Sequence, residues 1–336
     1  MSARADWIEY AREAVLHASV VCRRVQSRIG EVRAITKDDN SPVTVADFAA
    51  QAVVAHVLAQ RLGSFVLVGE ESSDFLKDAA NDAQLSAALD AARVVWPDVT
   101  RDKFIAALER GHGEPTAQGF WTLDPVDGTK GFLRGEQYAV ALAYVEHGEP
   151  VIGAMGCPNL PASFEKPLGT PDPTGTVYSC VRGGGVYESE AMLGSKPRTI
   201  ARVARQPGAP LRVTASVEKA HSNISATDQV AAIVSPKFEL VQVDSQCKYA
   251  VVARGQGDLY LRLPTKKGYV ERIWDHAAGS LVASESGCVV SDVHGKPLEF
   301  GHGRGLEKNA GIVCCERAIH AAVIDAIAKV KAQSAG

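Results

Sequence analysis

The chain has 336 residues, of which 46% are hydrophobic and 22% charged, and its formal net charge is −3. This composition is typical of a globular protein and excludes a disordered or strongly basic chain, so we expect neither a nucleic-acid polymer nor a membrane as partner. The seven cysteines form no C-x-x-C pair, which argues against a zinc ribbon. The N-terminus carries no uninterrupted apolar run that would indicate a signal peptide. We therefore expect a cytoplasmic protein with reduced thiols.

Helical and strand-like patterns follow one another through the first half of the chain. Apolar residues recur every three or four positions from Trp7 to Val25, which predicts an amphipathic helix that ends at Gly30. Two short apolar runs predict buried strands, and the first of them leads into acidic residues. The strands are predicted over residues 65–72, 120–123 and 176–189, a hairpin over 138–157, and further helices over 44–63, 82–95 and 99–110.

A change in composition near the middle of the chain predicts a domain boundary. Residues 195–210 are polar and basic and contain three prolines. We therefore divide the chain into an α+β domain of residues 1–205 and an α/β domain of residues 206–336. The second domain alternates strand-like with helix-like runs, as an α/β layer does. Its strands are predicted over 211–216, 238–243, 258–263 and 310–315, and its helices over 245–255, 274–287 and 316–333.

Carboxylates follow two of the predicted strands. Glu70 and Glu71 end one strand, whereas Asp124 and Asp127 follow the other in the segment DPVDGT. A tight turn alone would account for an Asp-Pro start and an Asp-Gly finish. However, sheet-based enzymes often place their chemistry at strand ends, and Mg²⁺ binds a few carboxylates together with water and phosphate oxygens. A turn and a cation site are therefore both open interpretations of this segment.

Two further aspartates stand where helices are predicted to begin. Thr44 and Asp47 have the spacing of a capping box, and Asp275 precedes a run of small residues as an N-cap would. A helix start with small side chains would equally let an anion or a metal-bound phosphate approach the backbone N–H groups. The glycine-rich segments 182–187 and 301–305 match neither the Walker A nor the dinucleotide-binding pattern, so we interpret both as loops.

Four segments resemble, in the same order, the motifs of one known family. That family is the lithium-sensitive, magnesium-dependent phosphatases, the superfamily of inositol monophosphatase and fructose-1,6-bisphosphatase. Two longer segments, DGTKGFLRGEQYAVALA and DSQCKYAVVARGQGDLYLRLP, resemble more narrowly the 3′(2′),5′-bisphosphate nucleotidases. The four matching segments are SPVTVAD (41–47), VGEES (68–72), TLDPVDGTKGF (122–132) and WDHAAGSLVASESG (274–287).

The resemblance implies a fold and an activity. The fold would be a layered αβαβα sandwich, in which the first domain binds metal and the second binds nucleotide. The activity would be Mg²⁺-dependent hydrolysis of the 3′-phosphate of adenosine 3′,5′-bisphosphate to AMP and phosphate, by in-line attack of a metal-activated water. The sulfated nucleotide and the 2′,5′ isomer would be further substrates, lithium an inhibitor and sulfur metabolism the setting. The alternatives are an inositol polyphosphate 1-phosphatase and a nucleotide-binding sensor without turnover.

The resemblance also assigns a role to each motif residue. Asp47 and Thr129 would orient the attacking water, and Glu70 would lie beside it. Two or three Mg²⁺ ions would be held by Glu70, Asp124, the carbonyl of Val126, Asp127 and Asp275. The substrate would be contacted by Gly128, Thr129, His221, Ser245, Lys248 and Arg262.

Some features of the chain limit these assignments. Taken without the resemblance, Lys248 and Arg262 could be surface charges and His221 an ordinary loop residue. Cys288 stands where family members usually have a second glycine, and the loop of residues 165–175 matches no family segment. Neither departure removes a proposed metal ligand. The sequence does not indicate the oligomeric state.

Overall fold

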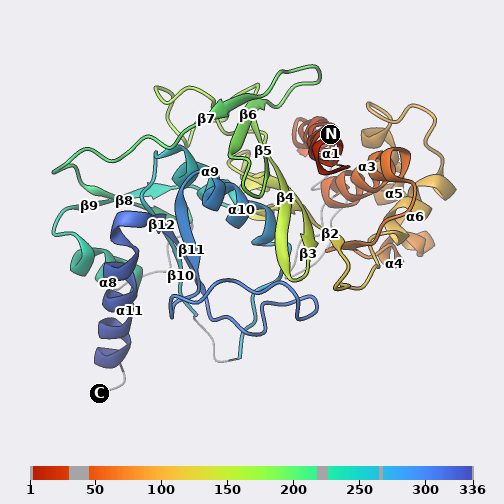
Figure 1. Cartoon of the computed structure of the whole chain (residues 1–336). Coiled ribbons are helices and arrows are strands. Elements are labelled where there is room, and N and C mark those ends of the chain that lie inside the picture. Colours follow the sequence, from red (N-terminus) through yellow and green to blue (C-terminus); the bar gives the residue numbers. More distant parts are fainter. Residues whose placement is uncertain (1–2, 30–44, 218–225, 265–267, 335–336) are drawn as a thin grey trace.

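The computed structural model describes residues 3–29, 45–217, 226–264 and 268–334 (Figure 1). Two short 3₁₀ turns, η1 (Ala79–Asn81) and η2 (Arg317–Ile319), accompany the α-helices. The α-helices are α1 (Ala3–Gln26), α3 (Val45–Leu62), α4 (Asp74–Lys77), α5 (Asp82–Ala92), α6 (Arg101–Glu109), α7 (Thr129–Arg134), α8 (Ala226–Val234), α9 (Cys247–Arg254), α10 (Ala277–Glu285) and α11 (His320–Ser334).

The described strands form two sheets. In the first sheet the order is β1-β2-β3-β4-β5-β6-β7, and only the β1–β2 pair is parallel. In the second sheet the order is β11-β12-β10-β8-β9. The strands are β1 (Leu67–Gly69), β2 (Phe120–Asp127), β3 (Ala139–Glu146), β4 (Glu149–Cys157), β5 (Thr176–Val181), β6 (Val186–Glu190), β7 (Arg198–Ile200), β8 (Leu211–Ala215), β9 (Phe238–Gln242), β10 (Leu259–Arg262), β11 (Cys288–Ser291) and β12 (Ile312–Glu316).

The sheets and helices stack as five layers, visible across Figure 1. Helices α1 and α3 pack on one face of the first sheet, and α10 packs on its other face, against β3, β4 and β5. Helix α9 lies beside α10 and contacts β8, β10 and β12 of the second sheet. Helices α8 and α11 close the stack, because their apolar residues form one core with Leu211, Val213 and Val313. The arrangement is therefore an αβαβα sandwich, as expected.

The alternation of side chains along β3 explains why the first sheet is covered on both faces. Val140 and Leu142 belong to the core beneath α1 and α3, whereas Ala139, Ala141 and Ala143 belong to the core shared with α9 and α10. Successive residues of a strand point to opposite faces, so a strand that is apolar at every position must be buried on both. The hairpin predicted over 138–157 was therefore correctly placed, and it forms the centre of the sheet.

Several sequence-based boundaries differ from the structure. Helix α1 ends at Gln26, and Gly30 lies outside the described residues. The segment DPVDGT is not a simple turn, because β2 continues to Asp127 and α7 begins at Thr129. Asp275 is not an N-cap, because His276 holds that position of α10. The capping-box alternative for Asp47 depends on Thr44, which also lies outside the described part.

The chain passes from one sheet to the other between Ile200 and Leu211. The division into domains of residues 1–205 and 206–336 stays a prediction, although this change of sheet falls at the same place. None of the described helices combines the length and apolar character needed to cross a membrane.

Candidate active site

Parallel pairing of β1 with β2 brings two acidic strand ends together. Leu67 pairs with Trp121 and Gly69 with Leu123, so the carboxyl ends of both strands lie at the same edge of the sheet. The N–H of Glu70 then donates to the carbonyl of Leu123 at 3.2 Å. Glu70 therefore begins its loop directly beside Asp124, the next residue of β2.

A β-bulge and a glycine set the orientation of Asp127, the second aspartate of the motif. Between Asp124 and Asp127 the pairing of β2 with β3 shifts register, which bends the strand locally. Gly128 follows with φ of 88°, and a Cβ at this position would lie 2.8 Å from the Cβ of Ser245. Only glycine combines this left-handed conformation with so close an approach. The hydroxyl of Thr129, the first residue of α7, donates to the carbonyl of Val126 at 3.4 Å.

The five predicted carboxylates gather from four separate segments. Asp47 comes from the first turn of α3 and is 3% exposed, and Asp124 comes from β2 and is 2% exposed. Burial, and then repulsion from Glu70, Asp127, Asp275 and Asp47, raises the pKa of Asp124 well above its usual range. Each of the other four groups is thus close enough to disfavour the charge on Asp124.

The same crowding raises the pKa of neighbouring groups. Loss of hydration and the charge of Asp47 raise the pKa of Glu70 to about 7, although a hydrogen bond with Asp124 opposes the rise. Burial likewise raises the pKa of Asp275 to about 7, opposed by His276 and reinforced by Asp127. The pKa of Glu71 is raised to about 9 by burial, Asp47 and Glu70. Without cations, the site therefore holds protons near neutral pH.

The donor set suits a hard divalent cation. Oδ1 of Asp124 is buried and has no hydrogen-bond partner among the described residues. A buried carboxylate oxygen without a partner is costly, and an ion would satisfy it. Carboxylate and carbonyl oxygens are the ligands that Mg²⁺ prefers. The residues present thus fit Mg²⁺.

A second cluster of possible metal ligands is better explained as a hydrogen-bonded support for Arg262 than as a separate metal site. Ligand atoms of Glu271, Asp275 and His276 lie within 4.8 Å of one another. However, both nitrogens of His276 are engaged, Nδ1 with the hydroxyl of Tyr249 at 3.0 Å and Nε2 with Glu271 at 3.3 Å. Glu271 also binds Nε of Arg262 at 2.9 Å. This network holds Arg262 beside Asp275, with 3.8 Å between their nearest charged atoms.

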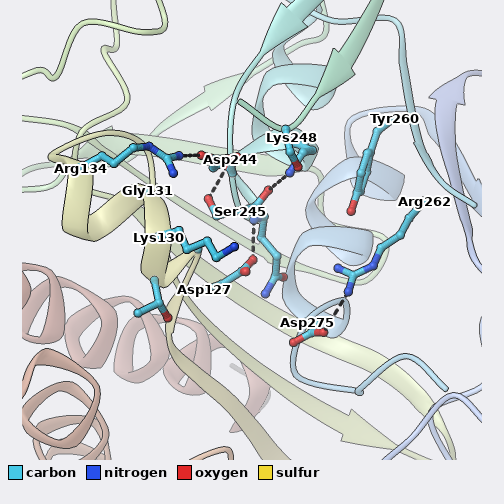
Figure 2. Close-up of a pocket in the computed structure, with 14 residues that line it drawn as sticks. Asp127, Lys130, Gly131, Arg134, Asp244, Ser245, Lys248, Tyr260, Arg262 and Asp275 are labelled. Carbon is cyan, nitrogen blue, oxygen red and sulfur yellow. Dashed lines mark hydrogen bonds and ion pairs between the residues drawn. The ribbon is translucent and has the colours of Figure 1, made fainter. Parts of the chain in front are cut away.

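Acidic and basic side chains together line a cavity of about 430 Å³, in which Arg262 lies beside Asp275 and Lys248 lies across from Asp127 (Figure 2). Lys248, on α9, is 7% exposed. Burial lowers the pKa of Lys248, whereas the charges of Asp127 and Asp244 oppose this shift. The lining residues are Asp127, Gly128, Thr129, Lys130, Gly131, Arg134, Ser216, Asp244, Ser245, Gln246, Lys248, Tyr260, Arg262 and Asp275.

Of the predicted substrate-contacting residues, Gly128, Thr129, Ser245, Lys248 and Arg262 line this one cavity. His221 lies outside the described residues, so its assignment stays a prediction. Ser245 adopts a positive φ of 63°, unusual for serine, and its hydroxyl accepts from the N–H of Cys247 at 3.2 Å. This turn starts α9 at the wall of the cavity.

Sequence reasoning missed several residues that shape the site. The N–H of Gln246 donates to Oδ2 of Asp127 at 2.5 Å, which ties the second half of the chain to the acidic motif. Arg134 forms an ion pair with Asp244 across the same boundary. Asp244 and Gln246 flank Ser245 within a matched segment, so their location was a usable signal. Tyr260 of β10 also lines the cavity, and it lies in the same matched segment, two residues before Arg262.

The small residues that begin α10 have a packing role. A Cβ on Gly279 would lie 2.2 Å from the ring of Tyr249 on α9. Ala277 and Ala278 are buried in the core that α10 shares with β3, β4 and β5. The small side chains therefore allow α9, α10 and the first sheet to pack closely. Close packing is enough to explain them, without a bound anion.

Comparison with solved structures agrees with the five-layer architecture. The extragenic suppressor protein suhB from Bartonella henselae superposes with a TM-score of 0.63 at 18% identity, covering 96% of this chain and 98% of that one. CysQ from Bacteroides thetaiotaomicron, a bacterial member of the inositol monophosphatase family, superposes with a TM-score of 0.58 at 21% identity, covering 93% and 97%. These likenesses confirm the expected fold.

Comparison with known sequences extends over almost the whole chain. Curated relatives include a 3′(2′),5′-bisphosphate nucleotidase of Schizosaccharomyces pombe, 39% identical with 96% of this chain and 95% of the relative covered. A 3′(2′),5′-bisphosphate nucleotidase of Oryza sativa is 36% identical, with 94% and 92% covered. The model of the inositol monophosphatase family matches residues 4–332. The resemblance drawn from the motifs is confirmed, and the chain belongs to the inositol monophosphatase family.

Proposed function

We propose that this phosphatase is a Mg²⁺-dependent 3′(2′),5′-bisphosphate nucleotidase that converts adenosine 3′,5′-bisphosphate to AMP and phosphate. The sulfated nucleotide and the 2′,5′ isomer are proposed as further substrates. Phosphatases of this family depend on metal ions, generally Mg²⁺. The names of relatives at 34–39% identity support the choice of substrate.

The observation that carries the proposal is the distribution of charge within one cavity. Asp127 and Asp275 stand on one side of it, and Lys248 lies on the helix across from them (Figure 2). A substrate with two phosphates needs two different environments. One phosphate must meet cations held by carboxylates, and the other must meet fixed positive side chains. A monophosphate would leave the buried ammonium of Lys248 without an anionic partner from the substrate.

The ions are assigned to the acidic cluster. Two or three Mg²⁺ ions would be held by Glu70, Asp124, Asp127 and the carbonyl of Val126, with Asp275 completing a second site. When bound, they neutralise charge on the transferred phosphate and lower the pKa of a water molecule. The unpartnered oxygen of Asp124 supports this assignment.

The remaining residues act on the water and on the substrate. Thr129 would orient the attacking water and relay its proton to Asp47, while Glu70 would lie beside the water. Water adds its oxygen to phosphorus as the bond to the ribose 3′ oxygen breaks, and this oxygen leaves with a proton as the 3′-hydroxyl of AMP. Arg262 is held in place by Glu271, and with Lys248 it would bind phosphate oxygens. His221, Ser245 and Gly128 would complete the nucleotide site.

The proposed division of labour follows the two halves of the chain. Residues 1–205 supply four of the five carboxylates together with Lys130 and Arg134 of the cavity wall, and residues 206–336 supply Asp275, Lys248 and Arg262. In this proposal the first is a metal-binding domain and the second a nucleotide-binding domain.

A substrate panel tests the proposal. Phosphate release is measured from adenosine 3′,5′-bisphosphate and from inositol 1,4-bisphosphate, in Mg²⁺ and in EDTA. We expect Mg²⁺-dependent release from the nucleotide and little from the inositol compound. A strong preference for the inositol compound would instead identify an inositol polyphosphate 1-phosphatase. Saturable nucleotide binding without turnover would identify a sensor, and activity undiminished in EDTA would refute the metal assignment.

A further inference from the structure

Arg304 lies in the glycine-rich segment 301–305, which the sequence indicated only as a loop. Its guanidinium donates from Nη2 to the carbonyl of Gly69 at 2.7 Å and from Nη1 to the carbonyl of Gly113 at 3.4 Å. Its Cζ also lies 5.2 Å from the centre of the Trp274 ring. One side chain therefore contacts three segments that are far apart in the sequence.

Two of these contacts adjoin proposed cation ligands. Gly69 is the last residue of β1 and immediately precedes Glu70, and Trp274 immediately precedes Asp275. Glu70 belongs to the first half of the chain and Asp275 to the second. The guanidinium thus links the two backbone segments whose separation sets the distance between these carboxylates.

The backbone around Arg304 is itself fixed to the segment that carries Asp275. The N–H of Ile273 donates to the carbonyl of Arg304 at 3.2 Å, and the N–H of Leu306 donates to the carbonyl of Glu271 at 2.8 Å. Between them, Gly305 pairs with Arg272 as an isolated antiparallel bridge. The backbone of Arg304 therefore moves together with residues 271–275, and its side chain contacts Gly69 from this fixed position.

The geometry requires a guanidinium and not merely a positive charge. A planar fork can donate to two carbonyls while its face lies on an aromatic ring, and an ammonium group cannot do this. The neighbouring ion pair is a poor explanation for this arginine, because Nη1 lies 3.8 Å from Glu114, whose side chain is 78% exposed.

We propose that Arg304 is a positioning residue that fixes Glu70 relative to Asp275 and thereby sets the affinity of the site for divalent cations. It contacts neither substrate nor ion, and the inference rests on the metal assignment of the proposed function. Residues that orient metal ligands from outside the coordination sphere typically contribute about 10–100-fold to metal affinity.

Whether cation binding becomes weaker or tighter when Arg304 is replaced distinguishes a positioning role from a simple electrostatic one. Arg304 is a positive charge near a cation site, so removing that charge should strengthen cation binding if charge alone matters. If Arg304 acts by positioning the ligands, its removal should weaken cation binding. Arg272 provides a control for charge, because its Cζ lies 5.9 Å from the same ring and its charge lowers the pKa of Glu70, yet its side chain donates no hydrogen bond within the described part of the chain.

The test measures Mn²⁺ binding by electron paramagnetic resonance in the full chain without substrate. Arg304→Met is expected to weaken binding about tenfold or more. Arg304→Lys, which keeps the charge and is the milder change, is expected to weaken it less but in the same direction. Arg272→Met is expected to leave binding unchanged or slightly tighter. As a second readout, the Mg²⁺ concentration for half-maximal nucleotidase activity should rise in both Arg304 variants, with kcat at saturating Mg²⁺ changed much less.

The outcomes are distinguishable. Mn²⁺ binding in Arg304→Met that equals or exceeds that of the unmodified chain would overturn the inference and leave the proposed function intact. Wild-type affinity in Arg304→Lys would overturn the requirement for a guanidinium, and this variant decides alone if Arg304→Met does not fold. An unmodified chain that binds no Mn²⁺ would overturn the metal assignment and, with it, the role of Arg304.

Discussion

Replacing Asp124 with asparagine should make the metal-free protein more stable and at the same time remove most of its stabilisation by Mg²⁺. Asp124 is 2% exposed, and four other carboxylates disfavour its charge. Two unit charges 4 Å apart repel by about 4 kcal/mol at an effective dielectric constant of 20, and protonation already relieves much of this in the metal-free state. We therefore expect Asp124→Asn to raise the free energy of unfolding by about 1 kcal/mol without metal, or about 2 °C in Tm.

The response to Mg²⁺ should change in the opposite sense. An ion at 100 times its Kd stabilises the folded state by about 2.7 kcal/mol, and the variant should lose most of this gain. Nucleotidase activity should fall about a thousandfold, equivalent to about 4 kcal/mol of transition-state stabilisation. Thermal unfolding in EDTA and in Mg²⁺, followed for both proteins, measures the first effect, and phosphate release measures the second.

Asp172 supplies the matched control. Its side chain is 6% exposed, but it pairs with Lys166 at 2.6 Å and accepts from the N–H groups of Thr174 and Gly175. Burial opposes the charge of Asp172, yet these partners outweigh it, and its pKa is lowered. Asp172→Asn should therefore destabilise the protein equally with and without Mg²⁺ and leave the Mg²⁺-induced rise in Tm intact. The reasoning fails if Asp124→Asn lowers the metal-free Tm, or if it keeps the rise seen in the unmodified chain.

Three further predictions concern the same site. In EDTA, Tm should fall between about pH 5 and about pH 8, because Glu70 and Asp275, each with pKa raised to about 7 when folded, hold protons that the unfolded chain has released; a rising Tm would contradict this. Lys248→Met should raise KM for adenosine 3′,5′-bisphosphate about tenfold or more and change kcat less, since a charged hydrogen bond contributes about 1.5–3 kcal/mol; unchanged steady-state KM would exclude phosphate contact. Thr129→Val should lower kcat about a hundredfold while Mn²⁺ affinity stays constant, and a parallel loss of Mn²⁺ binding would show instead that the hydroxyl supports the ion site.

Long, periodic elements were predictable from the sequence, whereas some short ones were missed. The repeats of apolar residues located α1 and α3, and the run of alanine and valine located the β3–β4 hairpin, since these patterns report burial directly. Helix α7 was missed because it has only six residues and its start depends on the left-handed conformation of Gly128. The bulge that ends β2 was missed for a related reason, because register against β3 is a property of two strands and not of one.

Some residues of the candidate site could likewise be predicted from the sequence, and others could not. Asp124, Asp127 and Asp275 lie in segments whose resemblance to a family is specific, so they could be named from the sequence. The partners that hold such residues in place come from distant segments, such as Gln246 for Asp127 and Arg304 for the strand end before Glu70. Only tertiary packing creates these contacts, and no local spacing encodes them.

The contact between the acidic strand end and the helix that carries Lys248 has a consequence for specificity. The bond from the N–H of Gln246 to Asp127 and the contact of Gly128 with Ser245 hold the end of β2 against the start of α9. Lys248 is the second residue of the same helix. The distance between the acidic cluster and this lysine is therefore fixed by packing between layers rather than by any loop. In the proposed function, a rigid spacing of this kind selects a substrate by the separation of its two phosphates.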